Sequence, residues 1–118
     1  MNNGATSIQK SYTFSTAEYE NILELFSALQ KEISIARHLP ETTRSKLFEK
    51  LEEMIISSGI SVNNMDVFWS FIARTEIAFK VFEANRVPEQ LIELAGIIWK
   101  VQCRAEGRPD DSALPIVF

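Results

Sequence analysis

Four stretches of this sequence repeat apolar side chains every three or four positions, and a helix-breaking residue follows each of them. This spacing places the apolar residues on one side of a helix, which has about 3.6 residues per turn. The breaks fall at Pro40, Gly59, Pro88 and Gly107, because proline and glycine are poorly tolerated inside helices. The pattern predicts four helices, over residues 16–37, 41–57, 65–84 and 88–105.

The first helix has a clear predicted start. Ser15 is expected to be its N-cap residue, with Glu18 placed three positions later to reach back to the Ser15 amide. Phe14 and Tyr19 occupy the two positions of a hydrophobic staple, which fixes the direction in which the chain enters a helix. Order in the chain is therefore expected to begin close to Phe14.

The other boundaries follow from turn-forming residues. Asn63 or Asn64 is expected to cap the third helix through its side-chain oxygen. Gly59 is expected to end the second helix in the left-handed conformation, and Gly107 with Pro109 to stop the fourth. The links between helices are short, which favours antiparallel neighbours.

The predicted fold class is therefore all-α, an antiparallel four-helix bundle. Residues 1–13 are small or polar without periodicity and are expected to form a disordered, flexible N-terminal arm. Residues 14–107 form the helical bundle domain, and residues 108–118 form a short, apolar C-terminal tail. At 118 residues and 46% hydrophobic composition, one domain with a real core is expected.

Charge and cysteine usage narrow the function classes. The formal net charge of −4 disfavours a general electrostatic attraction to nucleic acid, so nucleic acid is not expected as a partner. Cys103 is the single cysteine, which rules out an internal disulfide and fits a reducing compartment. No run of roughly 18 apolar residues and no secretory signal occur, so a cytoplasmic protein with no membrane role is expected.

The third and fourth helices carry more apolar residues than one core-facing side needs. These surplus residues lie among polar neighbours such as Ser70, Arg74 and Lys80. Either the bundle and its tail cover them, or they form the surface for a protein partner or a homo-oligomer, where tryptophan is enriched. The candidate interface residues are Trp69, Ile77, Val81, Ile92, Trp99 and Phe118.

The end of the chain poses the same choice. Ile116, Val117 and Phe118 follow a turn-prone polar stretch. We expect Ile116 and Phe118 to fill the groove between the first and fourth helices. The alternative is that an extended C-terminal peptide of this kind is captured by another protein.

Aromatic residues of the third helix suggest a second kind of site, a pocket for a small apolar ligand between bundle helices. Thr75 stands at the centre of this apolar face, and its hydroxyl is expected to bond to the carbonyl one turn earlier. The candidate pocket residues are Phe68, Phe71, Ile72, Thr75, Phe79 and Phe82.

No catalytic constellation is visible, so no enzyme activity, cofactor or metal site is expected. His38 is the only histidine and is interpreted as a charge at the end of the first helix, where the helix dipole favours a cation. Acidic residues fall mainly on predicted solvent faces. A modest basic cluster surrounds the corner between the first two helices, formed by Arg37, Arg44, Lys46 and Lys50.

These observations favour a small helical-bundle protein that acts by protein–protein interaction, as an adaptor, a regulator or an immunity or inhibitor-type factor, and that self-associates. Binding of a small apolar ligand is the alternative. A nucleic-acid-associated regulator that uses the basic corner is a third hypothesis.

Overall fold

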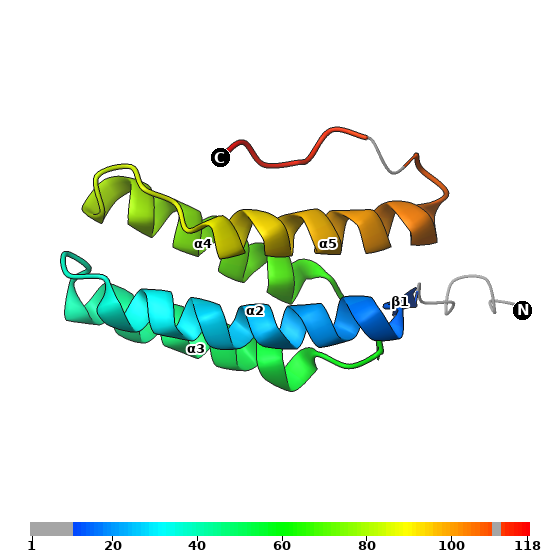
Figure 1. The fold of residues 1–118 in the computed structure, drawn as a ribbon, viewed down its shortest axis with the longest axis horizontal. Helices are drawn as coiled ribbons and strands as arrows, with labels where there is room; N and C mark the ends of the chain where they lie inside the picture. The colour runs from blue at the N-terminus through cyan, green and yellow to red at the C-terminus, as the bar shows by residue number, and fades with distance from the viewer. Residues whose placement is uncertain (1–10, 110–111) are drawn as a thin grey trace, which may run out of the picture.

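The computed structural model describes residues 11–109 and 112–118 and shows an all-α bundle. Its four helices run alternately in opposite directions, and each packs against the helices before and after it, with α2 beside α5 closing the ring (Figure 1). The bounds are α2 Thr16–Ile35, α3 Glu41–Ser57, α4 Asp66–Phe82 and α5 Glu89–Glu106. The predicted fold class is confirmed.

The core lies along the axis of the bundle and takes apolar residues from all four helices. Phe68 on α4 is fully buried, and its ring centroid lies 6.2 Å from that of Phe14 and 6.5 Å from that of Phe26. Phe14 precedes α2 and points into the same core, as its position in the predicted staple requires. Such ring contacts add to the free energy already gained by burying apolar area.

The start of α2 has the predicted capping box. The Ser15 amide donates to Glu18 Oε1 at 2.8 Å, and the Glu18 amide donates to Ser15 Oγ at 3.1 Å. At α4 the N-cap residue is Met65, so the prediction of Asn63 or Asn64 at that position is wrong, but Asn64 Oδ1 accepts a hydrogen bond from the Asp66 amide at 2.8 Å. These side chains satisfy amides that have no partner within the first helical turn.

The helix ends agree with prediction at Gly107 and differ at Gly59. Gly107 adopts φ 72° and closes α5, as expected for a left-handed cap. The prediction for Gly59 is wrong, because its backbone is not left-handed. The end of α3 is closed by Ser58 instead, whose amide and hydroxyl both donate to the Ile55 carbonyl, at 3.1 and 2.7 Å.

A two-stranded antiparallel sheet connects the start of the chain to the α3–α4 link. Its strands are β1 Tyr12–Thr13 and β2 Ser61–Val62, with Tyr12 opposite Val62. The predicted arm therefore ends earlier than residue 13, because backbone hydrogen bonds and the burial of Val62 hold β1 in place. The rest of that predicted arm, residues 1–10, lies outside the described residues.

The segment Ser112–Phe118, called here the tail segment, runs back along the bundle over α4 and α5 (Figure 1). The expected groove between the first and fourth helices is therefore wrong. At that junction, Arg104 of α5 already binds Glu18 of α2 and the Thr13 carbonyl of β1. The two tryptophans of α4 and α5 provide the apolar surface for the tail segment instead.

Candidate functional site

Two surfaces of α4 carry apolar residues that lie outside the core. The first is the groove between α4 and α5, called here the tryptophan groove, where Trp69 and Trp99 meet edge to face with centroids 6.3 Å apart. The Trp69 indole donates to Gln102 Oε1 at 2.9 Å, and the Trp99 indole donates to the Ser112 carbonyl at 2.9 Å. Both indole N–H groups therefore have partners, as tryptophans with little exposed surface require.

The tail segment covers this groove. Lys80 Nζ donates to the Val117 carbonyl at 3.3 Å, while Ile116 and Phe118 pack against the core with part of their surface exposed. The Arg108 guanidinium, just before the segment, lies 5.7 Å from the Trp99 ring centroid. An open hollow of about 410 Å³ adjoins the segment and is lined by Trp69, Ala73, Trp99, Gln102, Pro115 and Ile116.

Three of the predicted interface residues belong to this covered groove. Trp99 is only 8% exposed, and Trp69 and Phe118 are half-buried, so the chain itself covers most of their apolar surface. Ile92 is exposed, and it lies on the same side of α5 as Trp99 by its helical spacing. The structure thus brings Trp69, Trp99 and the tail segment together without a partner.

The other two predicted interface residues lie on the second surface, called here the α3–α4 face. Ile77 and Val81 are 58% and 65% exposed, one turn apart on α4, and Phe82 is exposed beside them. They line a groove of about 290 Å³ against Thr43 and Leu47 of α3. The prediction placed Phe82 in a ligand pocket, whereas the structure places it on this outer surface.

Charged residues of both signs continue the α3–α4 face. A second groove, of about 540 Å³, adjoins the first and shares Lys46 and Arg74 with it. Its lining includes Ile56 and a group of acidic and basic side chains, Glu49, Lys50, Glu52 and Glu53. The face therefore combines an apolar groove with a mixed-charge groove, which is suited to contact with another protein surface.

The predicted ligand pocket is filled by the protein core. Phe68, Phe71, Ile72 and Thr75 have no exposed surface, and none of them lines any groove described here. Thr75 Oγ1 has no hydrogen-bond partner among the described residues, so its predicted bond to the previous turn is wrong.

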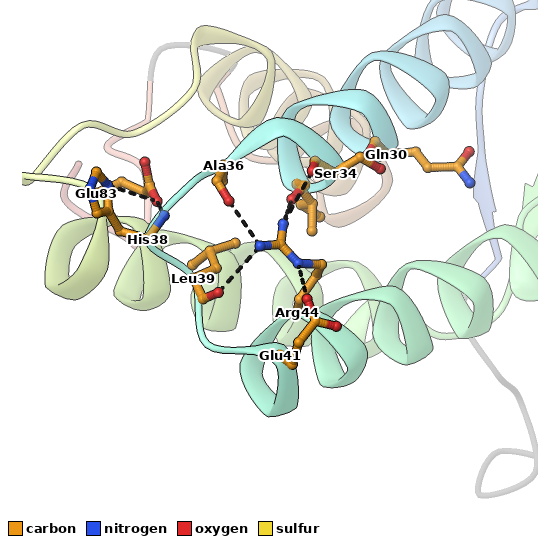
Figure 2. A network of polar contacts seen from close by, with 9 residues as sticks. Gln30, Ser34, Ala36, His38, Leu39, Glu41, Arg44 and Glu83 are labelled. Carbon is orange, nitrogen blue, oxygen red and sulfur yellow. Dashed lines mark hydrogen bonds and ion pairs between the residues drawn. The ribbon is translucent and has the colours of Figure 1, made fainter.

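The basic corner is a structural cap, as Figure 2 shows. The Arg44 guanidinium, on α3, donates to the carbonyls of Ile33, Ala36 and Leu39 at the end of α2, and Arg44 Nε donates to Glu41. The predicted cluster is dispersed, because Arg44 is taken up by these bonds. Lys46 lies on the α3–α4 face, and Lys50 pairs with Glu53 at 3.1 Å.

His38 lies beyond the end of α2. Its backbone amide donates to Glu83 Oε2 at 2.6 Å, and its ring Nδ1 lies 3.8 Å from the same oxygen (Figure 2). The role expected of His38, a cation at the end of the first helix, is filled by Arg44 because its guanidinium reaches the free carbonyls directly. Glu83 thereby connects the end of α4 to the link between α2 and α3.

Two contacts of α4 were missed by the sequence-based reasoning. Glu76 is buried and pairs with Lys80 at 2.5 Å, and Lys80 in turn holds the tail segment. The spacing of four positions between an acid and a following lysine was a usable signal for that pair. Nothing in the sequence pattern indicates that Lys80 also binds a carbonyl 37 residues further along the chain.

The described part of the chain offers few candidate residues for a metal site, a reactive thiol or a membrane span. Residues 11–109 and 112–118 contain no group of three side chains placed to hold a metal ion. Cys103 is a buried free thiol on α5. No helix within these ranges is both long and apolar enough to cross a membrane.

Comparison with protein-family models, with curated proteins and with solved structures gave no match.

Proposed function

We propose that this protein acts by protein–protein interaction and that it self-associates through the α3–α4 face. The observation that supports the proposal is the exposure of Ile77, Val81 and Phe82, which lie together on α4 beside an apolar groove. Burying such side chains in an interface is favourable by roughly 25 cal/mol per Å² of apolar area. An adaptor, a regulator or an inhibitor-type factor would use the surface in this way.

Self-association is proposed because the charges beside the apolar groove complement one another. A two-fold interface pairs the same surface of two copies, so a residue of one copy faces a different residue of the other. Lys46 and Arg74 border the apolar groove, and Glu49 and Glu53 lie next to them in the mixed-charge groove. Two copies related in this way place cations of one opposite carboxylates of the other, which favours correct pairing.

The two alternative functions receive less support from the structure. The aromatic cluster proposed for a small apolar ligand is packed within the core, and Arg44 of the basic corner is engaged by backbone carbonyls. A non-enzymatic role in the cytoplasm is part of the proposal, since the free thiol of Cys103 fits a reducing compartment.

Sedimentation equilibrium over a concentration series tests the proposal. We expect wild-type protein to show a concentration-dependent rise in mass, and the variant Ile77→Ser with Val81→Ser to weaken the association by at least about tenfold, or 1.4 kcal/mol. Both positions are exposed, so the variant is expected to keep its fold.

The matched control is Ile35→Ser, which changes an exposed isoleucine on α2, away from the α3–α4 face. It is expected to associate like wild type. A wild-type protein that stays monomeric at every concentration would reject self-association. Equal weakening by the control and the double variant would reject the α3–α4 face as its site.

A further inference from the structure

We infer that the tryptophan groove is a binding site for a peptide segment, and that the tail segment of a second copy of this chain can take the place of the resident one. The inference concerns a different face from the α3–α4 face and is independent of the proposed function. It rests on how the tail segment is held.

Two hydrogen bonds join the helices to the tail segment among the described residues, and both end on backbone carbonyls. The Trp99 indole binds the Ser112 carbonyl at 2.9 Å, and Lys80 Nζ binds the Val117 carbonyl at 3.3 Å. Every peptide segment offers such carbonyls, so these donors recognise a peptide backbone rather than one particular chain. Main-chain hydrogen bonds combined with pockets for side chains are a recurring mode of peptide recognition.

The side chains at the end of the tail segment alternate between the bundle and solvent, after a bend of the backbone at Pro115 and Ile116. Ile116 and Phe118 face the bundle and pack against the core, while Val117 between them is 86% exposed. Successive side chains of an extended chain point to opposite sides, so two anchors separated by one residue fit a groove of this kind. Ile116 and Phe118 therefore supply the side-chain part of recognition.

The fit of the resident segment is incomplete. Both anchors keep part of their surface exposed, and an open hollow of about 410 Å³ is lined by Pro115 and Ile116 together with the two indoles and Ala73. The segment is therefore held by a few contacts, and its release exposes Trp69 and Trp99 without opening the bundle core.

A second copy provides an occupant that makes the same contacts. Reciprocal exchange of identical segments yields a closed two-fold dimer and needs no new surface. The resident segment is favoured in dilute solution because its attachment gives it an effective concentration of the order of millimolar. Exchange is thus expected when the protein is concentrated, or when the resident segment is weakened.

The first test measures binding of a free peptide with the sequence of Ser112–Phe118 to the full chain. In the variant Ile116→Asn with Phe118→Asn, the resident anchors are lost and the groove is open. We expect saturable binding, followed by intrinsic fluorescence, because both tryptophans of the chain line this groove. Wild type is expected to bind the peptide at least about tenfold more weakly, since its own segment competes.

The control variant is Leu114→Asn with Val117→Asn, which changes exposed side chains of the same segment. It is expected to bind like wild type, and a peptide carrying the two anchor changes is expected not to bind the open groove. Circular dichroism establishes that each variant is folded. Absence of binding by a folded open-groove variant would overturn the inference, as would equal binding by open-groove and wild-type protein.

The second test mixes two complementary full-length chains. One is the open-groove variant, and the other carries Ala73→Arg, which fills its own groove and frees an intact tail segment. Both also carry Ile77→Ser and Val81→Ser, so that association through the α3–α4 face does not contribute. We expect a one-to-one complex in the mixture, in excess of any self-association of either chain. Peptide binding without this complex would overturn exchange between copies.

Discussion

Arg44 lies on α3, but its guanidinium serves the last turn of α2, where carbonyls lack amide partners (Figure 2). Its side chain is largely buried, at 16% exposure, so water is a poor substitute for these bonds. One charged residue thereby closes one helix and fixes the angle at which the next begins.

Replacement Arg44→Ala is predicted to lower the free energy of unfolding by about 1–3 kcal/mol, because the Ala36 and Leu39 carbonyls lose a charged donor. Urea denaturation measures this. The exposed Arg37→Ala is the control and is expected to change stability by less than about 0.5 kcal/mol. A similar decrease in the free energy of unfolding of both variants would show that stability depends on the positive charge at this corner rather than on the capping bonds.

Glu18 connects two helices, since its carboxylate binds Arg104 of α5 and the Ser15 amide at the start of its own helix, α2. The hydrogen bond from Arg104 is the largest of the causes that lower the pKa of Glu18, from 4.5 to about 2. A carboxyl group whose pKa is lower in the folded state stabilises the fold above its ordinary pKa, and this contribution disappears as the pH falls.

The stabilisation from Glu18 is therefore predicted to be complete above about pH 4.5 and to be lost between that pH and about pH 2. Urea denaturation at several pH values, compared with Glu18→Gln, measures it. The free energies of unfolding of the two proteins are expected to converge as the pH falls through this window. A constant difference between them would contradict the assignment, and the exposed Glu20→Gln is the control.

Thr75 buries a hydroxyl that has no hydrogen-bond partner in the described part of the chain. Valine has nearly the same shape without the polar group, and an unsatisfied buried polar group costs about 1–3 kcal/mol. Thr75→Val is therefore predicted to raise the free energy of unfolding by about 1 kcal/mol, measured by thermal or urea denaturation. Destabilisation would indicate that the hydroxyl has a partner in solution.

At the scale of elements, substitution of the glycine within α5 and of the glycine that caps its end is predicted to change the free energy of unfolding in opposite directions. Gly107 holds φ 72°, where any side chain adds strain, so Gly107→Ala is expected to destabilise by about 1 kcal/mol. Gly96 lies within α5, and an added Cβ meets nothing within 4 Å, so Gly96→Ala is expected to stabilise by about 0.5–1 kcal/mol. Urea denaturation of both variants measures the two changes in the free energy of unfolding. Changes of the same sign would contradict the assigned end of α5.

The helices were largely predictable because their signals are local. The Ser15 capping box, the breaks at Pro40 and Pro88, and the apolar periodicity set the elements within a few residues, and the bounds of α3 were predicted correctly. Helix α2 ends at Ile35, two residues before its predicted end at Arg37. That boundary depends on Arg44, which reaches back from the next helix, and no local pattern reports such a contact.

The sites were harder to predict because they depend on distant contacts. Periodicity identified a surplus of apolar residues on the third and fourth helices, and Ile77 and Val81 are indeed exposed. It did not show that the tail segment covers Trp99, since that depends on a backbone carbonyl at Ser112. The pair β1 and β2 was missed for the same reason, because two-residue strands held by backbone bonds leave no side-chain pattern.

At the scale of the whole molecule, α4 separates two surfaces with different occupants. On one side the tail segment covers the tryptophan groove, and on the other the α3–α4 face has no cover among the described residues. Exposed apolar residues that lie together are uncommon on proteins that work as monomers. We propose that the α3–α4 face is the surface on which copies of the protein meet.

The most direct measurement is a dilution series of amide NMR spectra on isotope-labelled wild-type protein. We predict that raising the concentration shifts the amide signals of α3 and α4 residues around Leu47, Ile77 and Val81, while those near Ile35 on α2 stay constant. Shifts confined to other surfaces, or spectra that do not change up to the solubility limit, would contradict the claim.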